Sequence, residues 1–369
     1  QVLGIGYFSL QLTSYLVDVR RGKQKPESQY ARLICFASFF LSITQGPFNR
    51  YDELMPQLDA AAPQPGQWQR GAQRCFWGYF KKLTVADRAA LAVNAAFAAP
   101  SAYDRSQLFL CAVLYVFQLY ADFSGYTDIV LGVGEVLGLH LPENFRQPFF
   151  ADSVKDIWAR WHISLSQWLR DYIYIPLGGS RCSKARKDGN LMITFLVSGL
   201  WHGAQWNYMA WGLLNGLYQV IGAALMPLRT AVVRALHIDP KSRPHKLLRV
   251  VVTFVLFSST MVFFRAYRLM DAVRIFISML TVHNFEIFTD GSIFVCGIDA
   301  FNFALLGIYV LVIFAADVCK YRRIKVRSVI EKQHWLCQVA VVALGVLTVL
   351  LLGVYGPGFE ASNFIYSQF

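Results

Sequence analysis

The feature that most constrains this chain is an apolar stretch from Asn190 to Met226, which holds no Asp, Glu, Lys or Arg. A helical crossing of a bilayer needs about 20 residues, so the stretch is too long for one upright pass. A break at Gly199 or around Gly203–Asn207 predicts two shorter passes, with His202 close to the fold-back. An ionisable side chain in hydrocarbon is costly and marks a functional site by default. The alternative is a core histidine bonded to a carbonyl or hydroxyl.

Further uncharged runs predict an all-α, polytopic membrane protein. The chain is 55% hydrophobic and 16% charged, whereas soluble chains carry about 25% charged residues. In lipid, every backbone polar group must be satisfied internally, which restricts the architecture to helices, with irregular segments buried in protein or lining water. We therefore expect transmembrane, oblique or re-entrant, and interfacial amphipathic helices. The uncharged runs are Leu33–Phe48, Ser106–Tyr120, Asn190–Met226, Val250–Phe264, Ala300–Ala316 and Trp335–Phe359.

Membrane orientation explains the net charge of +12 better than nucleic-acid binding does. Short loops rich in Lys and Arg mark the cytoplasmic side of a membrane, where anionic lipid attracts them. The chain crosses out and back between the second and third basic clusters, and again between the third and fourth. The last three clusters therefore fit one face. The four clusters are Arg20–Arg32, Arg181–Lys187, Arg229–Arg249 and Lys320–Arg327.

Sequence signatures of several other protein classes are absent. Seven scattered cysteines without a CxxC pair predict neither a disulfide framework nor a metal site. No HExxH, GxSxG or Walker motif occurs, so hydrolase and nucleotide-driven functions lack support. We expect no metal and no tightly bound cofactor. The cysteines are Cys35, Cys75, Cys111, Cys182, Cys296, Cys319 and Cys337.

Two segments combine charge with apolar sequence. Gly78–Ala99 is amphipathic and predicts a short helix that enters the bilayer obliquely. Gln107–Leu139 predicts one long helix, tilted or broken near Gly125. The segment Gln107–Leu139 is too acidic for a lipid-facing span, so its acidic side chains should face protein or water. The more common role of such side chains is hydrogen bonding between helices. The polar residues of this segment are Asp122, Ser124, Asp128 and Glu135.

The segment Asp152–Tyr174 predicts an amphipathic helix at the membrane interface, capped by Asp152 or Ser153. His162 falls at the edge of its apolar face, so it should look toward protein or membrane; an interfacial histidine without a catalytic duty is the alternative. A turn follows at Pro176–Ser180. The apolar face consists of Trp158, Trp161, Leu165, Trp168, Leu169 and Tyr172.

The chemistry available to two histidines in apolar surroundings is proton transfer. No acid stands at i+3 or i+4 of His202, and no paired cysteines accompany either histidine. Burial favours the neutral imidazole, which is the form that a general base needs to activate a hydroxyl or thiol.

Three long motifs resemble the membrane-bound O-acyltransferase (MBOAT) family, and within it the bacterial branch typified by the alginate O-acetylation membrane protein. They are ADFSGYTDIVLGVGEVLGLHLPENFRQPF, DIWARWHISLSQWLRDYIYIPLGGSR and SGLWHGAQWNYMAWGLLNGLY. The pieces GYFKKLTVADRAA, GPFNRYDELMPQL and the C-terminal NFIYSQF support the resemblance, which extends over essentially the whole chain. It implies a single membrane domain over residues 1–369, with helices around a central funnel or tunnel. Family members normally carry further N-terminal helices before the segment matching Leu3–Gly22.

The resemblance implies an enzyme that moves an acyl group to a hydroxyl, with the WHG histidine, His202, essential and the RWH histidine, His162, assisting. It implies a cytoplasmic donor such as acetyl-CoA or an acyl-phosphopantetheine carrier. The acceptor is a polysaccharide outside a bacterial cytoplasmic membrane, reached through an extracytoplasmic acetyltransferase partner. Seven further residues are candidates for binding the donor or the substrate, although side chains of these types more often serve in packing or as positive charge on the cytoplasmic side. These are Arg160, Arg170, Trp161, Trp201, Asp122, Ser124 and Asn144.

Other functions stay open at this point. D-Alanyl transfer to teichoic acid from a carrier protein is the alternative within the family, because that branch shares the RWH and WHG elements. A transporter is suggested by Asp122, Asp128 and the buried histidine, but transporters often show internal repeats, and none is visible here. A non-catalytic membrane scaffold is the third possibility.

Overall fold

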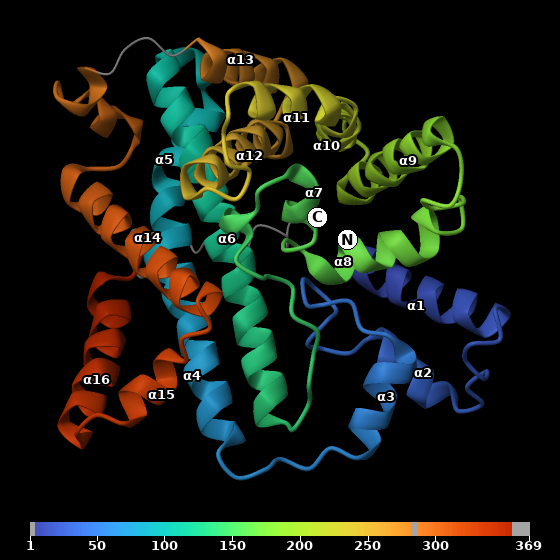
Figure 1. Cartoon of the computed structure of the whole chain (residues 1–369). Helices are drawn as coiled ribbons and strands as arrows, with labels where there is room; N and C mark the ends of the chain where they lie inside the picture. The colour runs from blue at the N-terminus through green and yellow to red at the C-terminus, as the bar shows by residue number, and fades with distance from the viewer. Residues whose placement is uncertain (1–3, 282–285, 356–369) are drawn as a thin grey trace.

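A computed structural model describes residues 4–281 and 286–355, and the regular elements in these ranges are helices (Figure 1). Two segments are π-helical, η1 (Lys81–Ala86) and η4 (Arg170–Tyr174). The 3₁₀ turns are η2 (Pro100–Ala102), η3 (Pro148–Phe150), η5 (Glu286–Phe288) and η6 (Ser292–Cys296). The α-helices are α1 (Ile5–Arg20), α2 (Tyr30–Ala37), α3 (Tyr51–Asp59), α4 (Gln67–Phe80), α5 (Asp87–Ala98), α6 (Arg105–Val136), α7 (Val154–Trp158), α8 (Ile163–Leu169), α9 (Lys184–His202), α10 (Trp206–Ala224), α11 (Met226–Ala235), α12 (Arg243–Arg265), α13 (Leu269–Leu280), α14 (Ala300–Tyr321), α15 (Val326–Glu331) and α16 (Trp335–Leu352).

The long helix α6 stands in the middle of the fold, with α4 and α5 alongside it (Figure 1). It starts at a capping box, in which Asp104 accepts from the backbone N–H of Gln107 and the Gln107 side chain accepts from the backbone N–H of Asp104. The predicted long helix is confirmed and runs through Gly125 without a break. Most of its side chains are buried, so it forms the core against which the site is built.

Glycines let α4 and α6 approach at the backbone. A Cβ atom added to Gly78 would lie 2.5 Å from the carbonyl oxygen of Gly125, and one added to Gly132 would lie 2.5 Å from that of Gly71. Small residues at such crossings allow close helix packing inside membranes. The close approach brings the basic side chains of the α4–η1 segment onto the acids of α6.

Those basic side chains form a buried ion-pair layer with α6. Lys81 Nζ lies 2.6 Å from Asp128 Oδ2 and donates to Ser124 Oγ at 2.8 Å. Lys82 Nζ lies 2.8 Å from Asp122 Oδ1 and 2.9 Å from Asp87 Oδ1. The prediction of one short, oblique helix over residues 78–99 is therefore wrong. The segment consists of the end of α4, a π-helical insert and α5, and its charges are satisfied by α6.

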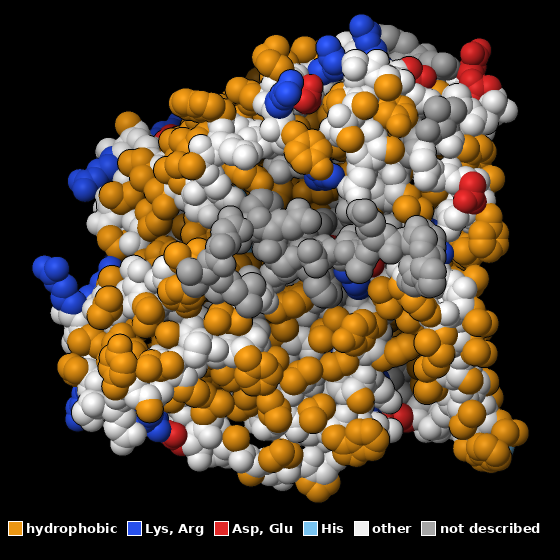
Figure 2. Space-filling view, turned by 180° about the vertical axis from the view of Figure 1, so that it is seen from behind, with side chains coloured by type: hydrophobic (Ala, Val, Ile, Leu, Met, Phe, Trp, Pro, Cys, Tyr) orange, Lys and Arg blue, Asp and Glu red, His pale blue; other side chains and the backbone are white. Residues whose placement is uncertain are grey.

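Four helices are long and apolar enough to cross a membrane within the described residues: α6, α12, α14 and α16. The bent pair α10–α11, with 50° between its helices, is a fifth candidate. Only 6% of the apolar window of α16 is buried, against 78% for α6, so α16 presents its side chains outward. Hydrophobic side chains are spread widely over the face in Figure 2, as expected for contact with lipid.

The outcome differs among the predicted uncharged runs. The run 33–48 is no span, because α2 ends at Ala37 and an irregular segment follows. The predicted fold-back within the run 190–226 is confirmed, since α9 ends at His202 and α10 begins at Trp206. The C-terminal NFIYSQF segment lies outside the described residues.

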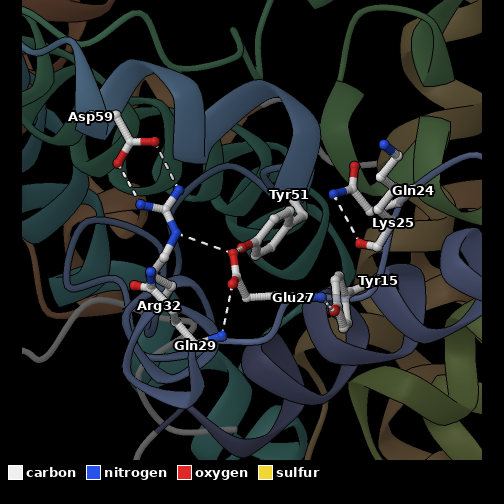
Figure 3. Close-up of polar contacts among 8 residues, drawn as sticks. All are labelled: Tyr15, Gln24, Lys25, Glu27, Gln29, Arg32, Tyr51 and Asp59. Atoms are coloured by element: carbon white, nitrogen blue, oxygen red, sulfur yellow. Dashed lines mark hydrogen bonds and ion pairs between the residues drawn. The ribbon is translucent and has the colours of Figure 1, made fainter.

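Glu27 joins α1, α2 and α3 through a cluster of hydrogen bonds (Figure 3). Its carboxylate accepts from the Tyr51 hydroxyl at 2.5 Å and from Arg32 Nε at 3.1 Å, while its backbone N–H donates to the Tyr15 hydroxyl at 2.7 Å. Arg32 also forms a two-point contact with Asp59, at 2.6 and 2.7 Å. The hydrogen bond from Tyr51 is the main reason that the pKa of Glu27 lies below its usual value.

Replacing Glu27 by glutamine is expected to lower the thermal unfolding midpoint at pH 7. A lowered pKa means that the carboxylate stabilises the folded chain above the ordinary glutamate pKa of about 4.3, and that this contribution is lost as the pH falls through the lowered value. The difference between variant and wild type should therefore close below about pH 4. Thermal unfolding of the detergent-solubilised protein across pH measures this. Glu53→Gln, an exposed change in α3, is the control, and an equal difference at every pH would contradict the assignment.

Candidate active site

The end of the α9–α10 hairpin holds His202 in an aromatic cage. Gly199 and Gly212 let the two helices meet at the backbone, and a Cβ added to Gly203 would lie 2.7 Å from the Tyr208 ring. The sequence therefore turns sharply after the histidine, whose side chain is buried. Centroid distances from its ring are 4.7 Å to Trp201, 4.9 Å to Phe264, 5.2 Å to Trp211 and 6.5 Å to Tyr208.

His162 stands at a backbone break between α7 and α8. It adopts the left-handed conformation, with φ 45° and ψ 53°, which is uncommon for a residue with a side chain. The following turn is fixed by Asn144, whose backbone carbonyl accepts from Ile163 N–H at 3.1 Å and whose side-chain oxygen accepts from Ser164 Oγ at 2.6 Å. The prediction of a single helix over residues 152–174 is thus wrong, whereas His162 faces protein, as predicted, and is 1% exposed.

Trp201 links the two histidines. Its ring centroid lies 4.7 Å from that of His202 and 6.4 Å from that of His162. Its indole N–H donates to the carbonyl of Gly6 at 3.1 Å, which fastens it to the start of α1. Two further rings enclose His162: Phe123 of α6 at 4.7 Å and Phe48 at 5.9 Å. Segments far apart in the sequence therefore converge on one layer of rings.

The environment keeps His162 neutral. Burial lowers the pKa of His162 well below its ordinary value, and the nearby His202 lowers it further. This residue lies in a turn outside the candidate spans. A neutral imidazole has one N–H donor and one acceptor nitrogen, so His162 offers a hydrogen bond to an oxygen without carrying charge.

The other predicted site residues divide into three groups: two residues of the histidine layer, Trp161, and four residues that are engaged elsewhere. Trp201 and Asn144 belong to the histidine layer, the latter by shaping the turn at His162. Trp161 directly precedes His162 in the chain, but its ring packs on those of Phe145 and Phe257, with centroid distances of 5.1 and 5.2 Å. The remaining four are engaged elsewhere: Asp122 with Lys82, Ser124 with Lys81, Arg160 with Asp156 at 2.9 Å, and Arg170 with Asp171 at 2.8 Å.

Several residues of the histidine layer were missed by the sequence interpretation. Phe123 lies between two residues that were singled out for their polarity, and Phe48 belongs to the quoted GPFNRYDELMPQL piece. Tyr7 also borders the layer, since its ring stacks on Phe48 at 4.8 Å and meets Trp201 at 5.4 Å. No periodic pattern connects these positions, because they come from separate elements. In the described part of the chain, no group of three or more His, Cys, Asp and Glu side chains could hold a metal ion.

Comparison with known proteins gives a family match across this site. Residues 18–269, which include both histidines, match the model for the MBOAT, membrane-bound O-acyltransferase family. The chain is 34% identical over 285 residues to the probable alginate O-acetylase AlgI of Pseudomonas aeruginosa, covering 77% of this chain and 52% of that protein. It is 32% identical over 305 residues to the peptidoglycan O-acetyltransferase of Helicobacter pylori, covering 75% and 56%.

A more distant match is the teichoic acid D-alanyltransferase of Bacillus subtilis, which is 28% identical over 235 residues, covering 58% of this chain and 57% of that protein. The chain spans about half the length of the curated relatives it matches.

Proposed function

Because the chain belongs to the membrane-bound O-acyltransferase family, we propose that it passes an acetyl group from a cytoplasmic thioester donor toward hydroxyls of an exported or cell-surface polysaccharide. The observation that carries this proposal is the buried pair His162 and His202, whose rings both lie near that of Trp201. The names of the relatives at 32% and 34% identity, which refer to O-acetylation of peptidoglycan and alginate, support acetyl as the group and polysaccharide as the acceptor.

In the proposed reaction, the neutral imidazole of His202 accepts the proton of the attacking hydroxyl. The hydroxyl oxygen bonds to the carbonyl carbon of the thioester, the C–S bond breaks, and the thiol leaves with a proton. The N–H of His162 donates to the carbonyl oxygen as negative charge develops there. A positioned base supplies a factor of about 10²–10⁴, and the rigid ring layer supplies the orientation that the rest of the acceleration requires.

The donor and the partner follow from the same proposal. Acetyl-CoA or an acyl-phosphopantetheine carrier supplies the thioester from the cytoplasm, and an extracytoplasmic acetyltransferase takes the group to the polysaccharide. The chain then resides in a bacterial cytoplasmic membrane, with its Lys- and Arg-rich loops inside. Both histidines are buried, which excludes bulk water that would otherwise hydrolyse the thioester.

The proposed function is tested by measuring the transfer of acetyl groups to the polysaccharide. Membranes from cells that make the chain, its extracytoplasmic partner and the polysaccharide are supplied with acetyl-CoA labelled in the acetyl group, and label in the polysaccharide is measured. Donor-dependent labelling is expected, and it should be absent from membranes that lack the chain. A D-alanyl-loaded carrier, offered in parallel, tests the alternative motivated by the D-alanyltransferase relative. Solute flux in liposomes without any acyl donor would identify a transporter instead.

A further inference from the structure

Three polar side chains beside the histidine layer are buried without hydrogen-bond partners. They are Tyr7, Gln11 and Gln45, with exposures of 6%, 1% and 1%. The Tyr7 hydroxyl and both amide atoms of each glutamine make no hydrogen bond to any described residue. A buried polar group left in this state is costly, and native interiors contain few. Five such atoms in one region indicate that something else satisfies them.

The three side chains come from two segments that pack against each other, the start of α1 and the loop before α3. α1 meets the loop before α3 closely at its start, where a Cβ added to Gly4 would clash with the carbonyl of Ile43. Tyr7 and Gln11 are one turn apart on the buried face of α1. Gln45 lies in that loop next to Thr44, whose Oγ1 pairs with the Tyr126 hydroxyl at 2.5 Å.

These two segments adjoin the candidate catalytic groups. The Phe48 ring stacks on Tyr7 on one side, at 4.8 Å, and on His162 on the other, at 5.9 Å. A ligand that bonds to Gln11 and Gln45 would therefore reach the histidines at its end. We call the set of Tyr7, Gln11 and Gln45 the amide slot.

The side chains of the amide slot carry no charge. Each glutamine presents an N–H donor and a carbonyl acceptor, which together match another amide group. Such a slot has no charge to pair with a phosphate or a carboxylate, but it matches a chain that carries neutral amides. The pantetheine arm of an acyl donor is such a chain, with its thioester at the end beyond the amides.

The position of α1 favours the donor over the polysaccharide. α1 leads from the histidine layer into the Arg20–Arg32 basic cluster, which the positive-inside rule places on the cytoplasmic side. At that end, Arg21 bonds to the carbonyl of Asp171 at 3.4 Å and Arg50 pairs with its carboxylate at 3.2 Å. Asp171 belongs to η4, which leads into the next basic cluster, Arg181–Lys187. The amide slot therefore lies on the cytoplasmic approach to the histidines.

We infer that Gln11, Gln45 and Tyr7 form a binding subsite for the pantetheine arm of the acyl donor, with the two glutamine amides bonded to the amides of the arm. The inference rests on the proposed acyl transfer. It assigns donor recognition to α1 and the loop before α3, outside the RWH and WHG motifs.

The test separates donor binding from folding. Gln11→Met and Gln45→Met keep the side-chain volume and remove the unpartnered amide. Without ligand, both variants should unfold at a higher temperature than wild type, because a costly buried group is gone. Their Kd for acetyl-CoA, measured by calorimetry on the full chain in nanodiscs, should rise roughly tenfold, the effect of one lost hydrogen bond. An acetyl-loaded acyl carrier protein in a second arm shows which source of pantetheine the protein uses.

Gln118→Met is the matched control, since Gln118 is also buried with an unpartnered amide oxygen but lies eight residues before Tyr126 on α6, about 12 Å along the helix. It should raise stability and leave the Kd for the donor unchanged. Unchanged donor affinity in Gln11→Met and Gln45→Met, with wild-type protein that binds the donor, overturns the subsite alone. Weakened binding of an alginate oligosaccharide instead assigns the slot to the acceptor and overturns it too. A wild-type chain that binds neither donor overturns both the subsite and the proposed function.

Discussion

His202→Ala is expected to lower polysaccharide O-acetylation by about 10²–10⁴-fold at equal membrane abundance, which is the contribution of a positioned general base. The loss should appear in turnover with little change in donor affinity, because the imidazole acts on the hydroxyl proton and the donor is held elsewhere. The fold should persist, since the alanine leaves Gly203 and the Gly199 contact with α10 unchanged. Product is measured by acetyl release from the isolated polysaccharide after mild base.

The control for this variant is His140→Ala, which removes an exposed histidine from the loop after α6. It should leave acetylation at the wild-type level. Acetylation that stays within a factor of two in His202→Ala would remove the proposed role. Loss of acetylation together with loss of the protein from the membrane would instead assign His202 to packing.

Asp128→Ala is expected to destabilise the folded protein by about 3–5 kcal/mol, the cost of breaking a buried ion pair from one side. The substitution leaves Lys81, whose side chain is 4% exposed, with the neutral hydroxyl of Ser124 as its hydrogen-bond acceptor. It also removes one of the two acids bonded to Arg74, which keeps Glu143 at 2.7 Å. Reversible unfolding in mixed micelles measures the free energy.

Two comparisons test this explanation. The double variant Lys81→Met with Asp128→Leu should recover most of the loss, because replacing both members of a buried pair by apolar side chains is often neutral. Glu331→Ala breaks the exposed pair with Arg327, at 2.6 Å, and should cost at most about 1 kcal/mol. If Asp128→Ala is no more harmful than Glu331→Ala, the ion-pair layer does not hold α4 against α6.

The fold-back after His202 was predictable because its signals are local. A charge-free run longer than one bilayer crossing must turn, and glycine with no Cβ is the residue that permits it. The structure places the turn within the predicted window, at Gly203. The long helix that became α6 was also predicted, over residues Gln107–Leu139.

The turn at His162 was not predictable because its determinants are distant in sequence. The spacing of Trp161, Leu165 and Trp168 is helical, so the pattern indicates one amphipathic helix over the whole segment. The Asn144 side-chain oxygen accepts hydrogen bonds from the backbone N–H and hydroxyl of Ser164, and these bonds, with the bridge between Phe145 and Trp161, override that pattern and hold His162 in the left-handed region. A local periodic pattern does not predict contacts between residues that are far apart in the sequence.

The charged residues of α4 and α6 show the same limit. Lys81 and Lys82 are adjacent, about 100° apart on a regular α-helix, and the amphipathic interpretation did not predict that both are buried against α6. Their burial depends on which acids of α6 they meet, and that depends on the glycine contacts between the two helices. The contact of Trp201 with both histidines likewise follows only from how α1, α8 and α9 pack.

The π-helical insert at Lys81–Ala86 has a consequence for chain length. Its hydrogen bonds reach one residue further than those of an α-helix, so the insert accommodates one additional residue. Deleting one of its six residues would let the insert close into an ordinary helix, and α5 would keep nearly the same azimuth, because a π-helical segment turns through less angle per residue than an α-helix. Arg88 would then still reach Asn302 and the carbonyl of Leu352. In this stretch, a one-residue gap between related chains is therefore compatible with an unchanged orientation of everything that follows.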